Sequence, residues 1–329
     1  MLFSLIIPVY NRPQELDELL QSLTLQTQKN FEVIVVEDGS SVPAGEVVSG
    51  YKDRLTIHYY TKTNSGPGQS RNYGAERSSG DYFIVLDSDC IIPPSYIEEV
   101  EKELACNPCE AFGGPDKAHD SFTDVQKAIN YSMTSFFTTG GIRGGKKKLD
   151  KFYPRSFNMG MKASTYRALK GFSPMRFGED IDFSIRLYES GARVSLFPEA
   201  WVFHKRRVDF RKFFKQVYNF GIARINLEKR HPGSMKIVHL LPAVFTLGVI
   251  LLLFLSLFSR WFLLPLLLYS LMIFLDASIK ERNVRIGAIA VAASFIQLIG
   301  YGLGFLTAVW KRVIKGEGEF GAYQKTFYK

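Results

Sequence analysis

The sequence predicts an α/β unit built on a parallel sheet, followed by a group of membrane-spanning helices. In residues 1–203, short apolar runs alternate with segments of helical periodicity, which is the order of a parallel sheet with crossover helices. Beyond residue 236, uncharged runs become long enough to cross the hydrocarbon core of a bilayer. A hydrophobic fraction of 46% with 22% charged residues excludes a disordered or collagen-like chain.

The first predicted element is a buried strand over residues 2–8, a short continuous apolar run. We expect a strand here rather than a signal peptide, because the run ends in a turn-like Pro8-Val9-Tyr10-Asn11 sequence without a small-residue cleavage site. A helix is predicted over residues 13–27, where leucines recur on one face. The remaining elements are strands at 31–36, 55–60 and 82–86, with a glycine-rich loop at 64–68 and a helix near 69–78.

Polar side chains follow three of these strands. Asn11 follows the first strand, Asp38 the second, and Asp87 and Asp89 the strand at 82–86. In open α/β sheets, the carboxyl ends of the strands form the edge where ligands bind. Two carboxylates at positions i and i+2 beyond a strand can hold a divalent cation and its phosphate ligands, although a solvated turn explains the same pattern when it stands alone.

Three further signals are ambiguous when taken singly. The loop at 64–72 could bring backbone N–H groups and Arg71 to a phosphate, or it could be a flexible turn. Glu179 and Asp180 begin a predicted helix, where acidic residues are commonly partners of the helix dipole. Cys106 and Cys109 have metal-site spacing but no second Cys or His pair nearby, so we expect reduced thiols in a cytosolic environment.

The basic excess behind the net charge of +9 lies next to the apolar tail. Residues 204–236 hold ten Lys and Arg against two Asp and Glu, whereas residues 1–203 are net acidic. This placement favours contact with anionic lipid and argues against a nucleic-acid partner. Within this segment, residues 209–229 carry an apolar helical stripe with basic residues beside it. We predict an interfacial amphipathic helix over an ordinary core-facing one.

Residues 237–329 are predicted to form a membrane anchor with about three helices, at about 237–258, 261–279 and 286–310. With residues 1–236 in the cytosol, this arrangement places seven flanking basic residues inside and four outside. Lys311, Arg312 and Lys315 fit poorly outside, and two true spans with a middle segment that dips in and returns would bring them inside. Gly300, Gly302 and Gly304 offer close helix contact.

Five motifs occur in an order and spacing that resemble the family 2 glycosyltransferases. They are 6–12 (IIPVYNR), 35–40 (VVEDGS), 64–74 (NSGPGQSRNYG), 87–89 (DSD) and 178–180 (GED). The resemblance covers roughly residues 1–230. It implies a GT-A fold, a nucleotide-sugar donor, a divalent cation (manganese or magnesium) and inversion at the anomeric carbon.

The resemblance also implies roles for single residues. Asp180 would be the general base, and Asp89 would ligate the metal. His204 would lie near the metal or the diphosphate, although a lone histidine is more often structural. The donor would be bound by Pro8, Tyr10, Asn11, Arg12, Asp38, Arg71 and Asp87. Among these, Pro8, Tyr10 and Asp38 would hold the base, usually uracil; Arg71 would lie near the nucleotide or its phosphates, and Asp87 near the ribose or metal.

Two departures from the family pattern refine the expectation. Cys90 stands where relatives often have another Asp, so we expect Asp89 to be the only direct ligand from this motif. Gln216-Val-Tyr-Asn stands where processive synthases carry Gln-x-x-Arg-Trp, which argues for transfer of a single sugar. The glycine-rich, basic residues 140–155 are interpreted either as a solvated loop or as a flap over the donor that attracts an anionic acceptor.

The sequence thus predicts three parts: a GT-A catalytic domain at 1–203, a basic amphipathic interfacial segment at 204–236, and the anchor at 237–329. The expected activity is inverting, metal-dependent, hexosyltransferase-like transfer of one sugar from a nucleotide-sugar donor, with a UDP-sugar as the expected donor. The expected acceptor is a lipid-linked or membrane-proximal glycan. The expected location is the inner membrane, with several spans and a cytoplasmic catalytic domain, in cell-envelope polysaccharide biosynthesis. The alternatives are a catalytically silent membrane scaffold of the same fold and a nucleotidyltransferase.

Overall fold

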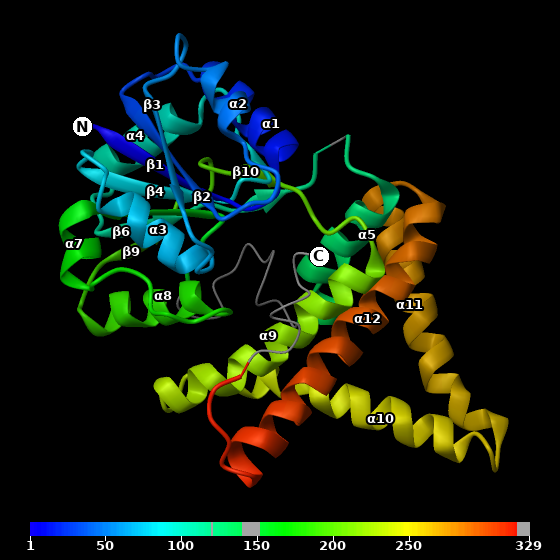
Figure 1. Cartoon of the computed structure of the whole chain (residues 1–329). Helices are drawn as coiled ribbons and strands as arrows, with labels where there is room; N and C mark the ends of the chain where they lie inside the picture. The colour runs from blue at the N-terminus through cyan, green and yellow to red at the C-terminus, as the bar shows by residue number, and fades with distance from the viewer. Residues whose placement is uncertain (120, 140–151, 321–329) are drawn as a thin grey trace. The chain divides into compact units, whose positions relative to one another are not determined.

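The computed structural model describes residues 1–119, 121–139 and 152–320, which form two compact units (Figure 1). The first unit comprises Met1–His119 and Asp150–Lys205. The second comprises Asp120–Leu149 and Arg206–Lys329. The chain therefore leaves the first unit, enters the second, returns, and finally continues into the C-terminal helices.

A seven-stranded sheet in the order β3-β2-β1-β4-β8-β6-β9 is the centre of the first unit. The four strands predicted from apolar runs are present and mutually parallel, since β1 pairs in parallel with β2 and β4, and β2 with β3. Their bounds are Phe3–Val9 (β1), Phe31–Asp38 (β2), Ile57–Lys62 (β3) and Tyr82–Leu86 (β4).

The prediction of a parallel sheet is correct for these four strands, whereas the sheet as a whole is mixed. Strand β8 (Asn158–Lys162) runs antiparallel to β4 and to β6 (Ala111–Gly113), whereas β9 (Val194–Leu196) is parallel to β6. A parallel neighbour requires a crossover connection back to the starting edge. The chain instead reaches β8 after its excursion into the second unit, so β8 enters from the opposite end.

Helices cover both faces of this sheet because its strands are buried on both sides. Alternate residues of β1 face opposite layers: Leu5 and Ile7 belong to one apolar cluster, and Ile6 belongs to the other. The predicted leucine face at 13–27 is the buried face of α1. The helices of this unit are α1 (Pro13–Thr24), α2 (Gly45–Ser49), α3 (Pro67–Ala75), α4 (Tyr96–Cys106), α7 (Ala163–Ala168) and α8 (Glu179–Glu189).

A second, three-stranded sheet lies beyond the end of β4. Its strands are β5 (Cys90–Ile91), β10 (Val202–His204) and β7 (Asp116–Lys117), in the order β5-β10-β7. Strand β10 pairs antiparallel with β5, which places His204 opposite Cys90. This pairing joins the predicted metal motif to a residue more than a hundred positions later in the chain.

The second unit is helical. It contains α5 (Asp124–Thr134), α6 (Phe136–Thr139), α9 (Phe210–Arg230), η1 (Ile237–His239), α10 (Leu241–Leu255), η2 (Arg260–Leu263), α11 (Leu264–Glu281), α12 (Val284–Ala308) and a π-helical turn η3 (Val309–Ile314). Helix α5 lies in this unit, although its residues fall within the range 1–203 that the sequence analysis assigned to one domain. The physical reason is its apolar face: Ala128 and Ile129 pack in one cluster with Ile273 and Ala290.

Helix α9 spans the segment predicted to be an amphipathic helix. Its stripe is buried at Phe213, Val217 and Ile222, while Arg211 and Lys212 are exposed. The stripe packs on α12, and the two helices lie side by side (Figure 1). The apolar face of α9 therefore covers protein, which is the core-facing alternative to a face buried in lipid.

Among the described residues, two helical segments are long and apolar enough to cross a membrane, Arg260–Glu281 and Val284–Ile314. The first predicted span, at 237–258, is divided into η1 and a helix α10 of 15 residues, which is about 22 Å long. The glycine motif of α12 does provide close contacts. A Cβ on Gly304 would lie 2.0 Å from the carbonyl oxygen of Tyr218, and one on Gly302 would lie 2.1 Å from Oγ1 of Thr246.

Candidate active site

The loops after β1 and β2 are joined by Asn11. Its backbone has a positive φ of 53°, and its N–H donates to Oγ of Ser40 at 2.7 Å. Its Oδ1 accepts from the backbone N–H of Val42 at 2.9 Å. Asparagine tolerates the left-handed backbone conformation better than most residues, which explains its place in this turn. Asn11 therefore shapes the edge of the sheet where Pro8, near the end of β1, and Tyr10 lie.

Asp38 organises the glycine-rich loop that follows β3. Its carboxylate accepts from the backbone N–H groups of Ser65 and Gly66, both at 2.9 Å, and from Nζ of Lys62 at 2.5 Å. The residue is only 3% exposed. Gly66 has a φ of 92°, a conformation that favours glycine. The structure thus gives Asp38 a role in holding the loop, whether or not it also accepts from a nucleotide base.

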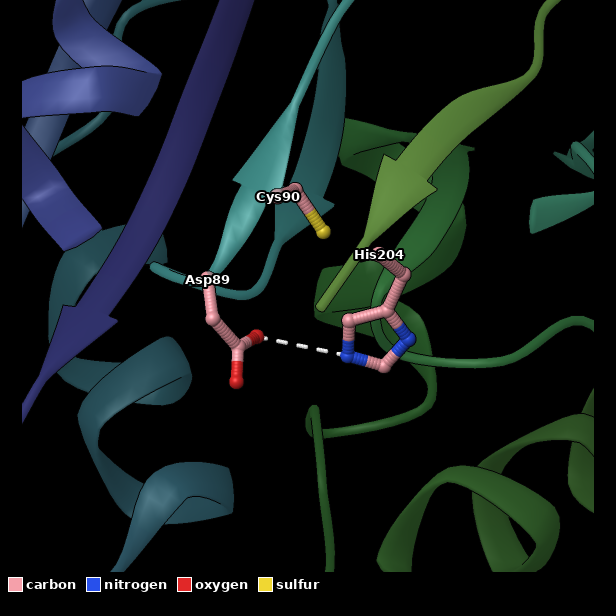
Figure 2. Close-up of side chains that lie close together, drawn as sticks. All are labelled: Asp89, Cys90 and His204. Atoms are coloured by element: carbon pink, nitrogen blue, oxygen red, sulfur yellow. Dashed lines mark ion pairs between the residues drawn. The ribbon is translucent and has the colours of Figure 1, made fainter. Parts of the chain in front are cut away.

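Asp89, Cys90 and His204 gather beyond the end of β4 (Figure 2). Oδ1 of Asp89 lies 3.3 Å from Nε2 of His204, and the other carboxylate oxygen of Asp89 pairs with the guanidinium of Arg12. The same Nε2 lies 3.9 Å from Oδ2 of Asp87. These contacts bring together four of the residues that the sequence assigned to the donor and the metal.

The thiol of Cys90 is a poor candidate ligand for a hard cation. It is fully buried and donates to the carbonyl oxygen of Phe157 at 3.5 Å. Burial, with Asp89 and Asp87 nearby, raises the pKa of this thiol well above its usual value, so it stays protonated. The oxygen and nitrogen atoms of Asp89 and His204 are the better donors for manganese or magnesium.

The imidazole of His204 is held in place by an aromatic neighbour. Its ring stacks on Phe157, with a centroid distance of 4.8 Å and an interplanar angle of 24°. Nδ1 of His204 is buried and has no hydrogen-bond partner in the part of the chain that the structure describes. Packing therefore fixes the ring so that Nε2 faces the two aspartates.

Arg71 lies next to Asp87 and bridges the carboxylates of Asp87 and Glu179. Its guanidinium donates to Oδ1 of Asp87 at 2.7 Å and to Oε1 of Glu179 at 2.9 Å. The Arg71 side chain is 3% exposed. Both terminal nitrogens of Arg71 therefore have carboxylate partners within the protein itself. Arg71 connects α3, the end of β4 and the start of α8.

Glu179 is the site residue that the sequence analysis undervalued. It begins α8 and is 7% exposed, and burial raises the pKa of its carboxyl to about 7, although the positive charge of Arg71 opposes this shift. The sequence signal was its position beside Asp180, which a role as helix-dipole partner explained equally well. The role of Glu179 is visible only in the structure, where Arg71 of α3 donates to Glu179 and to Asp87 and so links the two carboxylates. Lys62 and Arg155 were also missed.

Asp180 lies in the first turn of α8, which Gly178 precedes with a φ of 85°. Its Oδ2 lies 3.5 Å from Nη1 of Arg155, and its side chain is 16% exposed. This partial exposure allows access from solvent, whereas the neighbouring Glu179 is buried. Asp180 is therefore the more accessible of the two acidic residues. The possible flap at 140–155 lies largely outside the described residues, which exclude 140–151.

Comparisons of sequence identify the family. Residues 4–169 match the model described as Glycosyl transferase family 2. An uncharacterized glycosyltransferase of Rickettsia felis is 40% identical over 135 residues, which cover 41% of this chain and 22% of the relative. A pre-mycofactocin glycosyltransferase of Mycobacterium tuberculosis is 26% identical over 252 residues, 70% of this chain and 48% of the relative. The matched part of this chain thus spans less than half of each relative.

Solved structures share the fold. The mannosyltransferase PcManGT from Pyrobaculum calidifontis, in complex with GDP-Man and Mn²⁺, gives a TM-score of 0.68 at 13% identity, covering 94% of this chain and 87% of that one. Residues 1–349 of S. aureus TarS, in complex with UDP, give a TM-score of 0.51 at 20% identity, covering 96% and 92%. The GT-A fold expected from the sequence is therefore confirmed. Because the family model matches more than half of the chain, the chain belongs to glycosyltransferase family 2.

Proposed function

We propose that this chain transfers a single sugar from a nucleotide-diphosphate sugar to a lipid-linked or membrane-proximal glycan acceptor, with inversion at the anomeric carbon. The observation that supports this most directly is the meeting of Asp87, Asp89 and His204 at the carboxyl edge of the sheet. This is the edge at which open α/β sheets bind ligands. The nearby α8 adds Asp180 as a partly exposed carboxylate.

The side chains at this corner fit a divalent cation. Oδ1 of Asp89 and Nε2 of His204 approach to 3.3 Å, and Asp87 supplies a further oxygen 3.9 Å from that nitrogen. Carboxylate oxygen and imidazole nitrogen are donors that manganese accepts, and magnesium takes the oxygens. Asp89 and His204 would hold the ion, with Asp87 beside it. When bound, the ion would neutralise charge on the diphosphate leaving group.

Asp180 is the proposed general base. Inversion by single displacement needs one carboxylate that takes the proton of the acceptor hydroxyl as its oxygen attacks the anomeric carbon. The nucleoside diphosphate leaves with the electron pair of the broken glycosidic bond. Nη1 of Arg155 lies 3.5 Å from Oδ2 of Asp180 and places a positive charge beside the proposed base. Glu179 is paired with Arg71 and is thereby kept from the same role.

The donor site is proposed to lie along the loops after β1, β2 and β3. Pro8, Tyr10 and Asp38 would contact the base, while Asn11 and Arg12 would shape the adjacent loop and support Asp89. Two fold neighbours are solved with GDP-Man and with UDP, so both nucleotides belong in the test. We propose UDP-sugars as the first class, because the family motif at Asp38 most often accompanies uracil.

The proposed location is the cell (inner) membrane, with several membrane passes and the catalytic unit on the cytoplasmic face. The long apolar helices of the second unit and the ten basic residues of 204–236 support this location. A membrane-bound enzyme reaches lipid-linked acceptors without releasing them into water. An acceptor used in assembly of cell-envelope polysaccharide would fit this chemistry.

A donor screen tests the proposal. Membranes containing the full chain are incubated with radiolabelled UDP- and GDP-sugars, with and without Mn²⁺ or Mg²⁺, and nucleoside diphosphate release and lipid-extractable label are measured. We expect both products together, dependent on the metal and absent in membranes carrying Asp180→Asn. Pyrophosphate release would instead identify a nucleotidyltransferase. No turnover with any donor, despite metal-dependent nucleotide binding, would favour the silent scaffold.

A further inference from the structure

Helix α12 runs beside α9 along its length, and the two helices point in the same direction. A Cβ on Gly300 would meet Val217, one on Gly304 would meet Tyr218, and Oη of Tyr218 donates to Thr307 at 2.9 Å. Further along both helices, Nζ of Lys229 donates to the carbonyl oxygen of Arg312. Residue numbers rise together in these pairs, which fixes the parallel direction.

The starts of the two helices also lie close together. Arg285, at the start of α12, pairs with Asp124 of α5 at 3.3 Å. The side-chain amide of Gln126, also on α5, donates to the carbonyl oxygen of Arg206, just before α9, at 2.9 Å. At the other end, Arg230 pairs with Glu319 at 3.0 Å. The start of α12 is therefore linked to the start of α9 through α5, and the segment that follows α12 is linked directly to the end of α9.

Helix α9 is unsuited to cross a membrane. Its 21 residues, about 32 Å in length, include seven charged side chains distributed from its first turn to its last. Charged side chains within a spanning helix are rare and costly because hydrocarbon cannot solvate them. A helix with this composition lies in water or among lipid headgroups. Because α12 is parallel to α9 and linked to it near both ends, α12 also lies outside the hydrocarbon core.

The distribution of exposed apolar side chains agrees with this placement. Between Ile286 and Val309, all described, α12 exposes only Ala288 and Ala292, since α5, α9, α10 and α11 surround it. The segment 240–279, which holds α10, η2 and most of α11, by contrast exposes large apolar side chains along its length. These are Leu240, Leu241, Val244, Leu247, Ile250, Leu251, Leu253, Phe254, Leu257, Phe258, Trp261, Phe262, Leu264, Leu267, Leu268, Leu271, Met272, Leu275 and Ile279.

We propose that only the hairpin formed by α10 and α11 enters the bilayer, and that α12 lies with α9 on the side of the catalytic unit. Hydrocarbon would cover the exposed apolar residues of the hairpin. The C-terminal end of α12 would lie on the same side of the membrane as the catalytic unit, which contains Cys106. Length and composition alone would make α12 a spanning helix. Between Ile286 and Val309, however, no large apolar side chain is exposed, because other helices of the unit cover them. This inference rests on the membrane association in the proposed function and not on sugar transfer.

The charges support this topology. Eleven Lys and Arg residues lie from Arg224 to Lys315, both included. Ten of them fall outside the hairpin tip, which is the turn at residues 256–263 between α10 and α11. The cluster at Lys311, Arg312 and Lys315 then lies beside Lys229 and Arg230, facing the same anionic headgroups. The exception is Arg260 at the tip. The positive-inside rule is therefore obeyed better than with three spans, where that cluster would lie outside.

Cysteine labelling with a membrane-impermeant maleimide tests the topology in cells that express the full chain. Two variants, Glu317→Cys and Gly318→Cys, report the C-terminal end of α12, and both positions are exposed. Native Cys106 is also exposed and reports the side of the catalytic unit. Peptide mapping by mass spectrometry assigns each label, and labelling in detergent-denatured samples gives the total.

We expect position 317 or 318 to follow Cys106: both protected in intact cells and both labelled in inverted vesicles. Labelling at 317 and 318 from outside while Cys106 is protected would overturn the proposal, as would protection of both positions on both sides. If Cys106 and position 317 are labelled together from outside, the topology stands and the proposed cytoplasmic location fails. Release of the chain by alkaline carbonate would overturn the proposed entry of the hairpin into lipid.

Discussion

The guanidinium of Arg71 and the carboxylate of Glu179 form a buried ion pair, with 2.9 Å between Nη1 and Oε1. The pair joins α3 to the start of α8, and the second arm of Arg71 reaches Asp87 at 2.7 Å. Asp87 in turn faces His204. A continuous line of charged groups therefore connects the first turn of α8, which carries the proposed base, to the corner proposed to hold the metal. Helix α8 follows β4 by about ninety residues in the chain.

Loss of Arg71 should destabilise the first unit. Arg71→Met leaves Glu179 and Asp87 without their cation, and removing one partner of a buried pair typically costs about 3–5 kcal/mol. Thermal unfolding of the purified full chain in detergent measures the change. Arg77→Met is the matched control, because Arg77 is one-third exposed and pairs only with the exposed Glu76 among the ion pairs formed by the described residues. Equal melting temperatures for both variants would contradict the structural role.

Glu179 should make stability depend on pH. Burial raises the pKa of this carboxyl from 4.5 to about 7, so the folded state binds the proton more tightly than the unfolded state. The contribution of Glu179 to stability is therefore fully present below pH about 4.5 and decreases as pH rises toward 7. Glu179→Gln removes this titration. We expect the melting temperature of the wild type to fall relative to the variant between pH 5 and 8; parallel curves would show that Glu179 does not titrate there.

Substitution of the proposed base should impair turnover, whereas substitution of the proposed metal ligand should impair nucleotide binding. Asp180→Asn keeps the shape of the side chain but removes the proton acceptor, so turnover should fall at least about 100-fold with little change in donor affinity. Asp89→Ala should weaken nucleotide binding that depends on Mn²⁺. Nucleotide affinity is measured by calorimetry with and without metal. Near wild-type turnover of Asp180→Asn would exclude Asp180 as the base.

The close contact between α9 and α12 should depend on Gly304. A Cβ at this position would lie 2.0 Å from the carbonyl oxygen of Tyr218, too close to be relieved without shifting backbone. We expect Gly304→Ala to cost about 1–3 kcal/mol, despite the better helix propensity of alanine. Gly248→Ala on α10 meets nothing within 4 Å and is the control, expected to be neutral or slightly stabilising. Thermal unfolding in the same detergent compares the two.

A charge should be tolerated on α12 and not on α10. Leu251 and Ala292 are both exposed, but only Leu251 belongs to the proposed lipid-facing hairpin. Leu251→Arg should reduce the fraction of the chain that resists carbonate extraction, because a charged side chain in hydrocarbon costs about 2.5–3.5 kcal/mol. Ala292→Arg should leave that fraction unchanged. An equal loss for both variants would place α12 in hydrocarbon as well.

The parallel half of the sheet could be predicted from sequence because its strands are buried on both faces. Such strands form continuous apolar runs, as at Phe31–Asp38 and Tyr82–Leu86, and these runs are visible without any partner. Strand β8 carries Asn158, Gly160 and Lys162 beside two methionines, so it has no continuous apolar run by which it could be predicted. The candidate site residues after β1, β2 and β4 were found for the same reason, since each follows a recognisable strand.

What the sequence determined by itself is therefore local and periodic: strand runs, helical stripes, motif order and the amount of apolar tail. Tertiary structure decided which distant groups meet, such as Arg71 with Glu179 and His204 with Asp89. It also decided what covers each apolar face. A stripe on α9 or a 25-residue apolar run on α12 has the same pattern whether lipid or protein covers it. The physical reason is that hydrophobic burial is non-directional: it requires removal from water and does not specify the partner.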